Sequence, residues 1–114
     1  MRYLIVTLVL MLVACGGTVT GTDVIDGFRT ITYEFSGDVD TVHYIDWAVG
    51  NGICRGISDA ELPYSVEVEL VGRVNASIEK HDTSGIVTID VYENGGRIGG
   101  GTCPDGELGL IWIE

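Results

Sequence analysis

The sequence predicts an all-β fold, an antiparallel β-sandwich of about seven strands. Three observations lead to this fold class. Short segments alternate apolar and polar residues with the two-residue period of a half-buried strand. Gly, Asn, Asp and Pro separate these segments at intervals of about ten residues, and no segment keeps the 3.6-residue period of a helix. The chain has 114 residues, 46% of them hydrophobic, which suits the core of one domain.

The predicted strands of the first half are bounded by turn residues. Ile31, Tyr33 and Phe35 alternate with polar residues, so one face of this segment is expected to be buried. The second segment is rich in β-branched and aromatic residues, which favour strands. The alternation is cleanest around Val66 and Val68. These strands are predicted at residues 28–35, 41–47, 53–57 and 64–70.

Four more segments follow in the second half. Asn94-Gly95 lies between two alternating runs, and both residues tolerate the positive φ of a type I′ turn, so a tight hairpin is expected there. The glycines at 99–101 indicate a bulge or a close approach of the backbone to another group. These strands are predicted at residues 74–79, 87–92, 97–103 and 108–113.

The N-terminus has the pattern of a bacterial lipoprotein signal. Arg2 precedes an apolar run over residues 4–13, which is shorter than the ~20 residues of a membrane-spanning helix. Leu12-Val13-Ala14-Cys15 resembles the lipobox, whose cysteine receives a diacylglyceryl group after which the signal is cleaved before it. The resemblance implies a signal peptide at 1–14, lipidation of Cys15, a flexible Gly/Thr-rich tether within 15–27 and a β-sandwich domain at 28–114.

This signal predicts a location outside the cytoplasm. The lipid on Cys15 would hold the protein at the cell membrane or outer membrane, facing the periplasm or the exterior. Gly16 favours the outer membrane in a cell with two membranes, where an aspartate at this place favours retention at the inner one. An uncleaved strand or helix with a chance cysteine is the alternative. The net charge of −11 argues against nucleic-acid binding, because phosphate contacts need a basic surface.

Two cysteines remain once Cys15 is lipidated. Disulfides persist outside the cytosol, so we expect a Cys54–Cys103 disulfide that ties two facing sheets. Two buried free thiols are the alternative. No metal site is expected on this pair, because it lacks nearby histidines to complete four ligands.

No residue pattern predicts catalysis, a cofactor or a metal, and the protein is expected not to be an enzyme. His43 and His81 are the only histidines, the first in a predicted strand and the second in a loop expected to be mobile. Ser84 follows His81 closely, but catalysis would also require an orienting acid beside a base and a nucleophile.

The acidic and aromatic residues have ordinary structural interpretations. Glu67 and Glu69 share one strand face and are expected to be solvated. The aspartates of the turns are expected to be solvated too, although oxygen-rich loops can bind Ca²⁺; they are Asp23, Asp26, Asp38 and Asp40. Aromatic residues such as Trp47 and Tyr64 are expected in the core or in cross-strand pairs, with a binding face as the alternative.

Several segments together resemble the MmpS family and related bacterial lipoproteins. They are Tyr33-Glu34-Phe35-Ser36-Gly37, Val42-His43-Tyr44, Leu62-Pro63-Tyr64 and residues 87–95. The resemblance implies an immunoglobulin-like sandwich in the cell envelope and an accessory role beside a large RND-type exporter of lipids or drugs. This chain has a lipobox where that family usually has a transmembrane helix.

The sequence therefore predicts a lipid-anchored envelope protein that presents an acidic β-sandwich to a protein partner. One alternative is a domain that binds a small molecule, a lipid or Ca²⁺ through its aromatic residues or acidic loops. Another is a hydrolase, which would require a pocket that holds a histidine beside a hydroxyl group.

Overall fold

The computed structural model describes residues 28–114. The predicted signal peptide at 1–14, the lipidation site Cys15 and the tether at 15–27 lie outside the described residues. The described part forms eight strands: β1 (Arg29–Gly37), β2 (Thr41–Gly50), β3 (Ile53–Glu61), β4 (Tyr64–Leu70), β5 (Asn75–Glu79), β6 (Val87–Glu93), β7 (Gly96–Cys103) and β8 (Gly109–Ile113). Residues 28–114 contain no helix long and apolar enough to cross a membrane.

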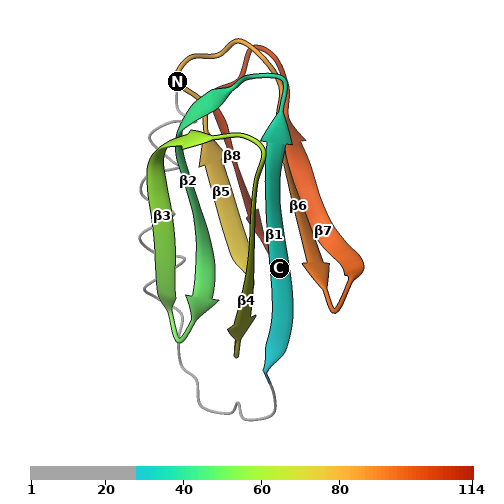
Figure 1. Ribbon diagram of the computed structural model, residues 1–114. Helices are drawn as coiled ribbons and strands as arrows, with labels where there is room; N and C mark the ends of the chain where they lie inside the picture. Colours follow the sequence, from blue (N-terminus) through green and yellow to red (C-terminus); the bar gives the residue numbers. More distant parts are fainter. Residues whose placement is uncertain (1–27) are drawn as a thin grey trace.

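The strands form two antiparallel sheets of four that pack face to face (Figure 1). The first sheet has the order β4-β1-β6-β7 and the second has the order β3-β2-β5-β8. Consecutive strands stay within one sheet only in the β2–β3 and β6–β7 hairpins, and the other connections cross between the sheets. The predicted antiparallel sandwich is confirmed, with eight strands in place of about seven.

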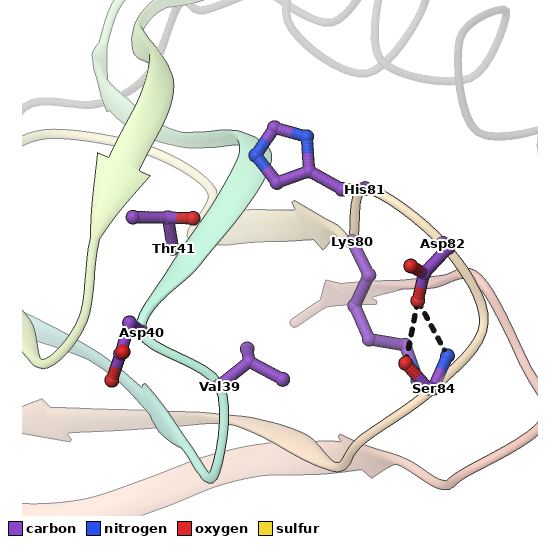
Figure 2. A pocket seen from close by; sticks show the side chains of 7 residues that line it. All are labelled: Val39, Asp40, Thr41, Lys80, His81, Asp82 and Ser84. Carbon is purple, nitrogen blue, oxygen red and sulfur yellow. Dashed lines mark hydrogen bonds between the residues drawn. The ribbon is translucent and has the colours of Figure 1, made fainter.

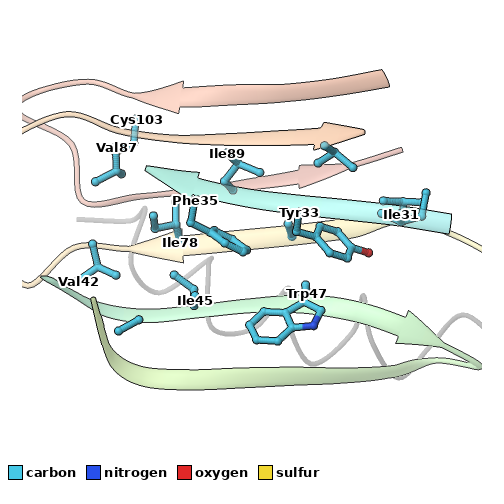
Figure 3. Close-up of a cluster of buried hydrophobic side chains, with 14 of the residues drawn as sticks. Ile31, Tyr33, Phe35, Val42, Ile45, Trp47, Ile78, Val87, Ile89 and Cys103 are labelled. Atoms are coloured by element: carbon cyan, nitrogen blue, oxygen red, sulfur yellow. The ribbon is translucent and has the colours of Figure 1, made fainter. Parts of the chain in front are cut away.

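The core lies between the two sheets (Figure 3). Ile31, Tyr33 and Phe35 are fully buried on β1, and the residues between them are half-buried, as the alternation predicts. Trp47 packs against Phe35 with ring centroids 6.0 Å apart, so it belongs to the core. The hydroxyl of Tyr33 donates a hydrogen bond of 2.8 Å to the carbonyl of Ala48, which satisfies the polar end of this buried ring.

The turn and glycine predictions are confirmed at the β6–β7 hairpin. Asn94 and Gly95 have φ angles of +52° and +89°, as a type I′ turn requires. Gly99 lies under the indole of Trp112, where a Cβ atom would come within 2.2 Å of the ring. The register between β6 and β7 also shifts between Val91 and Tyr92. The glycine run therefore lies where the backbone closely approaches the indole of Trp112 and next to an irregularity of the β6–β7 ladder.

The expected Cys54–Cys103 disulfide is wrong. Cys103 is a buried free thiol at the end of β7, and burial raises its pKa. Cys54 lies on β3, with its Sγ atom 3.9 Å from Oδ1 of Asn75. The reason is topological: β3 and β7 occupy opposite outer edges of different sheets (Figure 1), so the body of the sandwich separates the two residues.

Candidate functional site

One cluster of polar side chains forms where β2, β3 and β5 meet at one end of the second sheet. His43 lies on β2, Asp59 lies on the neighbouring β3, and His81 follows the end of β5, which pairs with β2 on its other side. All three side chains are exposed, and one nitrogen or oxygen atom from each lies within 4.8 Å of the others. Two adjacent strands and the segment that follows a third thus contribute one side chain each.

His43 and Asp59 are exposed because each alternates with a core residue of its own strand, Val42 on β2 and Ala60 on β3. Val42 pairs with Ala60, Ile45 pairs with Ile57, and both pairs pack into the core. Side chains alternate in a regular strand, so two positions three residues apart cannot both face inward without a local twist. Asp59 adopts a φ of +53° in the intervening stretch, a left-handed conformation uncommon for residues other than glycine.

The three side chains have a converging geometry. Nε2 of His81 lies 3.5 Å from Oδ1 of Asp59. The two imidazole rings meet edge to face, with centroids 5.8 Å apart and planes at 66°. The carboxylate of Glu79, at the end of β5, is close enough to His43 to interact with it electrostatically, although burial raises the pKa of Glu79 overall.

Lys80 fixes the loop that carries His81. It is the only lysine of the chain and is only 3% exposed. Its Nζ atom donates hydrogen bonds to the carbonyls of Thr83, Gly85 and Pro104 at 3.1, 2.5 and 3.1 Å. The expectation that this loop is mobile therefore disagrees with the structure, because a buried ammonium group holds its backbone from within.

Carboxylates hold the same loop from outside. Asp38 accepts a hydrogen bond from the amide of Ile86 at 2.8 Å, and Asp105 accepts one from the amide of Gly85 at 2.9 Å. Asp82 accepts hydrogen bonds from the amide and the hydroxyl of Ser84, which lower its pKa. Asp38 and Asp82 thus have backbone partners, as turn residues commonly do.

A shallow, open cavity of about 220 Å³ lies beside His81 (Figure 2). Its lining is mostly polar and consists of Val39, Asp40, Thr41, Lys80, His81, Asp82 and Ser84. The hydroxyl of Ser84 donates to Asp82 at 2.6 Å, whereas His81 approaches Asp59. The arrangement of a base beside a nucleophile that a hydrolase requires is therefore not formed by His81 and Ser84.

A second candidate site is the outer face of the first sheet. Four carboxylates of this sheet occupy positions that alternate with the buried core residues, and we call them the acidic face: Glu34, Glu67, Glu69 and Asp90. Glu34 stands directly opposite Asp90 in the β1–β6 ladder. Asp90 forms an ion pair with Arg97 at 2.9 Å. Within residues 28–114 none of the three glutamates has such a pair.

The neighbouring carboxylates at one end of the sandwich are neutralised. Arg29 donates hydrogen bonds to both oxygens of Glu93 at 3.3 and 2.9 Å and to both oxygens of Glu114 at 2.6 and 2.7 Å. These bonds lower the pKa of Glu93. Glu93 and Glu114 are paired with Arg29, whereas the three glutamates of the acidic face are not paired, so the acidic face carries a local excess of negative charge.

Comparison with known proteins adds no assignment. No protein-family model matches the chain, and no curated protein matches it in sequence. The resemblance to the MmpS family stays a prediction.

The structure sorts the sequence-predicted residues into three groups. Glu67 and Glu69 are exposed on one face, as expected. Cys54 and Cys103 are kept apart, and Cys15 lies outside the described residues. His43 and His81 are brought together with Asp59, which sequence reasoning missed. No local signal pointed to Asp59, because its meeting with the two histidines depends on the order of β3, β2 and β5 in the sheet.

Proposed function

We propose that this protein is a lipid-anchored envelope protein, held at a membrane through Cys15, that presents the acidic face to a basic surface of a protein partner. The observation that supports this proposal most is the local excess of carboxylates on the first sheet. The resemblance to the MmpS family would make an RND-type exporter that partner.

The acidic face is suited to recognition because two of its carboxylates, Glu67 and Glu69, are exposed and the other two are half-buried on the same sheet. Glu67 and Glu69 project from β4 toward solvent, and the β1–β4 ladder fixes their spacing. Complementary charge accelerates encounter and suppresses wrong partners more than it adds affinity. A basic partner would also relieve the repulsion between Glu34 and Asp90, which face each other across the ladder.

A purely structural role for the glutamates is the competing explanation. β4 is an edge strand of the first sheet, and charged residues on an edge strand discourage pairing with another chain. In that case their loss would promote aggregation and leave partner binding unchanged.

A photo-crosslinking residue at Ser65, an exposed position of the same strand, distinguishes the two roles. Crosslinking in the native envelope is expected to give one protein adduct. The double variant Glu67→Lys/Glu69→Lys is expected to weaken its formation by about tenfold or more. The matched control Glu61→Lys/Glu107→Lys makes the same charge change at exposed positions away from the face and should retain the adduct. Equal adduct yield in both double variants would contradict a role in recognition.

The anchor is tested separately. Cys15→Ser is expected to move the protein from the membrane pellet to the soluble fraction and to abolish labelling with a fatty acid, because the acylated thiol is the proposed attachment. Unchanged partitioning and labelling would contradict lipidation at this residue.

A further inference from the structure

We propose that His43, Asp59 and His81 form a binding site for a divalent transition-metal ion of the Zn²⁺ or Cu²⁺ type. This site is separate from the acidic face and does not depend on the proposed partner.

The donor atoms favour this class of ion. Two imidazole nitrogens and one carboxylate oxygen are ligands that Zn²⁺ and Cu²⁺ commonly take in proteins. Ca²⁺ and Mg²⁺ prefer oxygen ligands only, so they are expected to bind poorly here. Three protein ligands would leave at least one coordination position for water or for a group from another molecule.

The distances are close to those that coordination requires. Bonds of about 2.0–2.1 Å in a tetrahedral arrangement place neighbouring donor atoms about 3.4 Å apart. His81 Nε2 and Asp59 Oδ1 are already 3.5 Å apart, and the whole set lies within 4.8 Å. Because all three side chains are exposed, small rotations about their side-chain bonds would close the remaining ångström without moving the core.

The backbone around the site is held by contacts that do not involve the ligands themselves. His43 and Asp59 stand on paired strands between the pairs Val42–Ala60 and Tyr44–Ser58. His81 follows Lys80, whose three hydrogen bonds anchor the loop. The left-handed backbone of Asp59 costs free energy that the surrounding ladder must offset, and conformations of this kind are concentrated at functional sites.

The electrostatic surroundings favour a cation. The carboxylate of Glu79 interacts with His43, and that of Asp82 interacts with His81. The ammonium group of Lys80 is the opposing charge, but it is buried and bonded to three carbonyls. The site therefore combines two imidazole donors and one carboxylate donor with further carboxyl groups nearby.

Metal titration of the full chain, purified in detergent and stripped with a chelator, tests the site. Zn²⁺ competed against a chromogenic chelator is expected to bind at one ion per chain with a Kd of about 1 μM or tighter. Since the chain has only two histidines, a Cu²⁺ electron paramagnetic resonance spectrum with two imidazole nitrogens can arise in one chain only from this pair. Binding weaker than about 0.1 mM, or a spectrum without two nitrogens, would overturn the proposal.

Variants assign the binding to the three residues. His43→Gln, His81→Gln and Asp59→Gly are each expected to weaken Zn²⁺ binding by about tenfold or more. Glycine adopts a positive φ readily, so Asp59→Gly removes the ligand without straining the strand. Asp40→Asn, which removes a carboxylate from the adjacent cavity, should change the affinity by less than about threefold. Equal losses in all four variants, or none, would refute the assignment.

Melting temperatures measured with chelator and with Zn²⁺ show whether each variant is folded, and they test this site separately from the proposed function. In the presence of chelator the variants should melt close to the unsubstituted protein, and Zn²⁺ should raise the melting temperature only of proteins that keep the three ligands. Glu67→Lys/Glu69→Lys should retain Zn²⁺ binding, so failure of partner recognition and failure of the metal site give different results.

Discussion

The two sheets of this sandwich differ in how far their polar and charged side chains are buried. In the first sheet β1 alternates between buried and half-buried residues, and the carboxylates Glu67 and Glu69 of β4 are exposed. In the second sheet all five residues of β5 are buried, including Asn75, Ser77 and Glu79, which alternate with the core positions. Asp46 on the neighbouring β2 is only 4% exposed.

This difference in burial determines which groups stabilise the charged side chains of each sheet. Asp46 accepts a hydrogen bond of 2.7 Å from the hydroxyl of Ser77, and Lys80 donates to three carbonyls. Glu34, Glu67 and Glu69 have no ion pair within the described residues. Because a buried charge loses its hydration, substitutions in the second sheet should have large effects on stability and those on the acidic face small ones.

Lys80→Met should have the largest effect. It removes the three hydrogen bonds that a buried charged donor makes to the loop, so we expect a loss of about 3–4 kcal/mol of unfolding free energy. For a domain of this size that corresponds to a fall in melting temperature of more than about 12 °C. Differential scanning calorimetry measures it. Arg73→Met removes an exposed cation and should change the unfolding free energy by less than about 0.5 kcal/mol. Equal effects of the two variants would contradict the difference between buried and exposed charges.

Asp46→Asn should stabilise the protein at neutral pH. Burial raises the pKa of Asp46 from 3.8 to about 6, so the folded state retains a proton that the unfolded state releases. This contribution to stability is complete below about pH 4 and is lost as the pH rises through about 6. At about 1.4 kcal/mol per pKa unit, the variant should gain about 2–3 kcal/mol at pH 7. Urea unfolding across this pH range measures it, and a variant with an unchanged pH slope would argue against burial of the charge.

Cys103→Ala should cost about 1–1.5 kcal/mol, as expected for a small buried side chain. Loss of a disulfide would cost about 2–5 kcal/mol. Iodoacetamide should modify Cys103 in urea without any reductant, because its thiol is free and becomes accessible on unfolding. Modification only after reduction, detected by peptide mass spectrometry, would contradict the free thiol.

Glu34→Gln should have the smallest effect, a gain of about 0.3–0.5 kcal/mol at low salt. The substitution relieves repulsion with Asp90 across the ladder. Salt screens charges that solvent can reach, and both carboxylates are partly exposed, so the gain should shrink in about 0.5 M salt. Chemical denaturation at two salt concentrations tests this, and a gain that does not depend on salt would mean that repulsion is not its cause.

Alternation and turn chemistry predicted most of the fold. Every predicted strand exists, and the Asn94-Gly95 turn closes the β6–β7 hairpin as expected. The third strand was predicted to end at Ile57 but continues to Glu61, because its pairing with β2 runs on to Thr41. The left-handed conformation of Asp59 within it is not described by any alternation pattern. Local pattern therefore located the strands but not their irregularities.

The candidate sites were predictable to different degrees. Glu67 and Glu69 lie on one strand, so their shared face follows from the two-residue period. His43 and Asp59 come from neighbouring strands and His81 from the segment after β5, and the order of these strands in the sheet is not local information. The Cys54–Cys103 prediction failed for the same reason, since the parity of cysteines says nothing about which strand edges adjoin.

The sequence by itself determined the β-strands, the buried face of each strand in the first sheet and the acidic character of the opposite face, because these depend on the spacing of neighbouring residues. Only the tertiary structure decided the strand order, the burial of Asp46 and Lys80, and the meeting of two histidines with Asp59. These depend on which strands pair and what packs above them, and pairing between distant segments is set by the whole core rather than by any one segment.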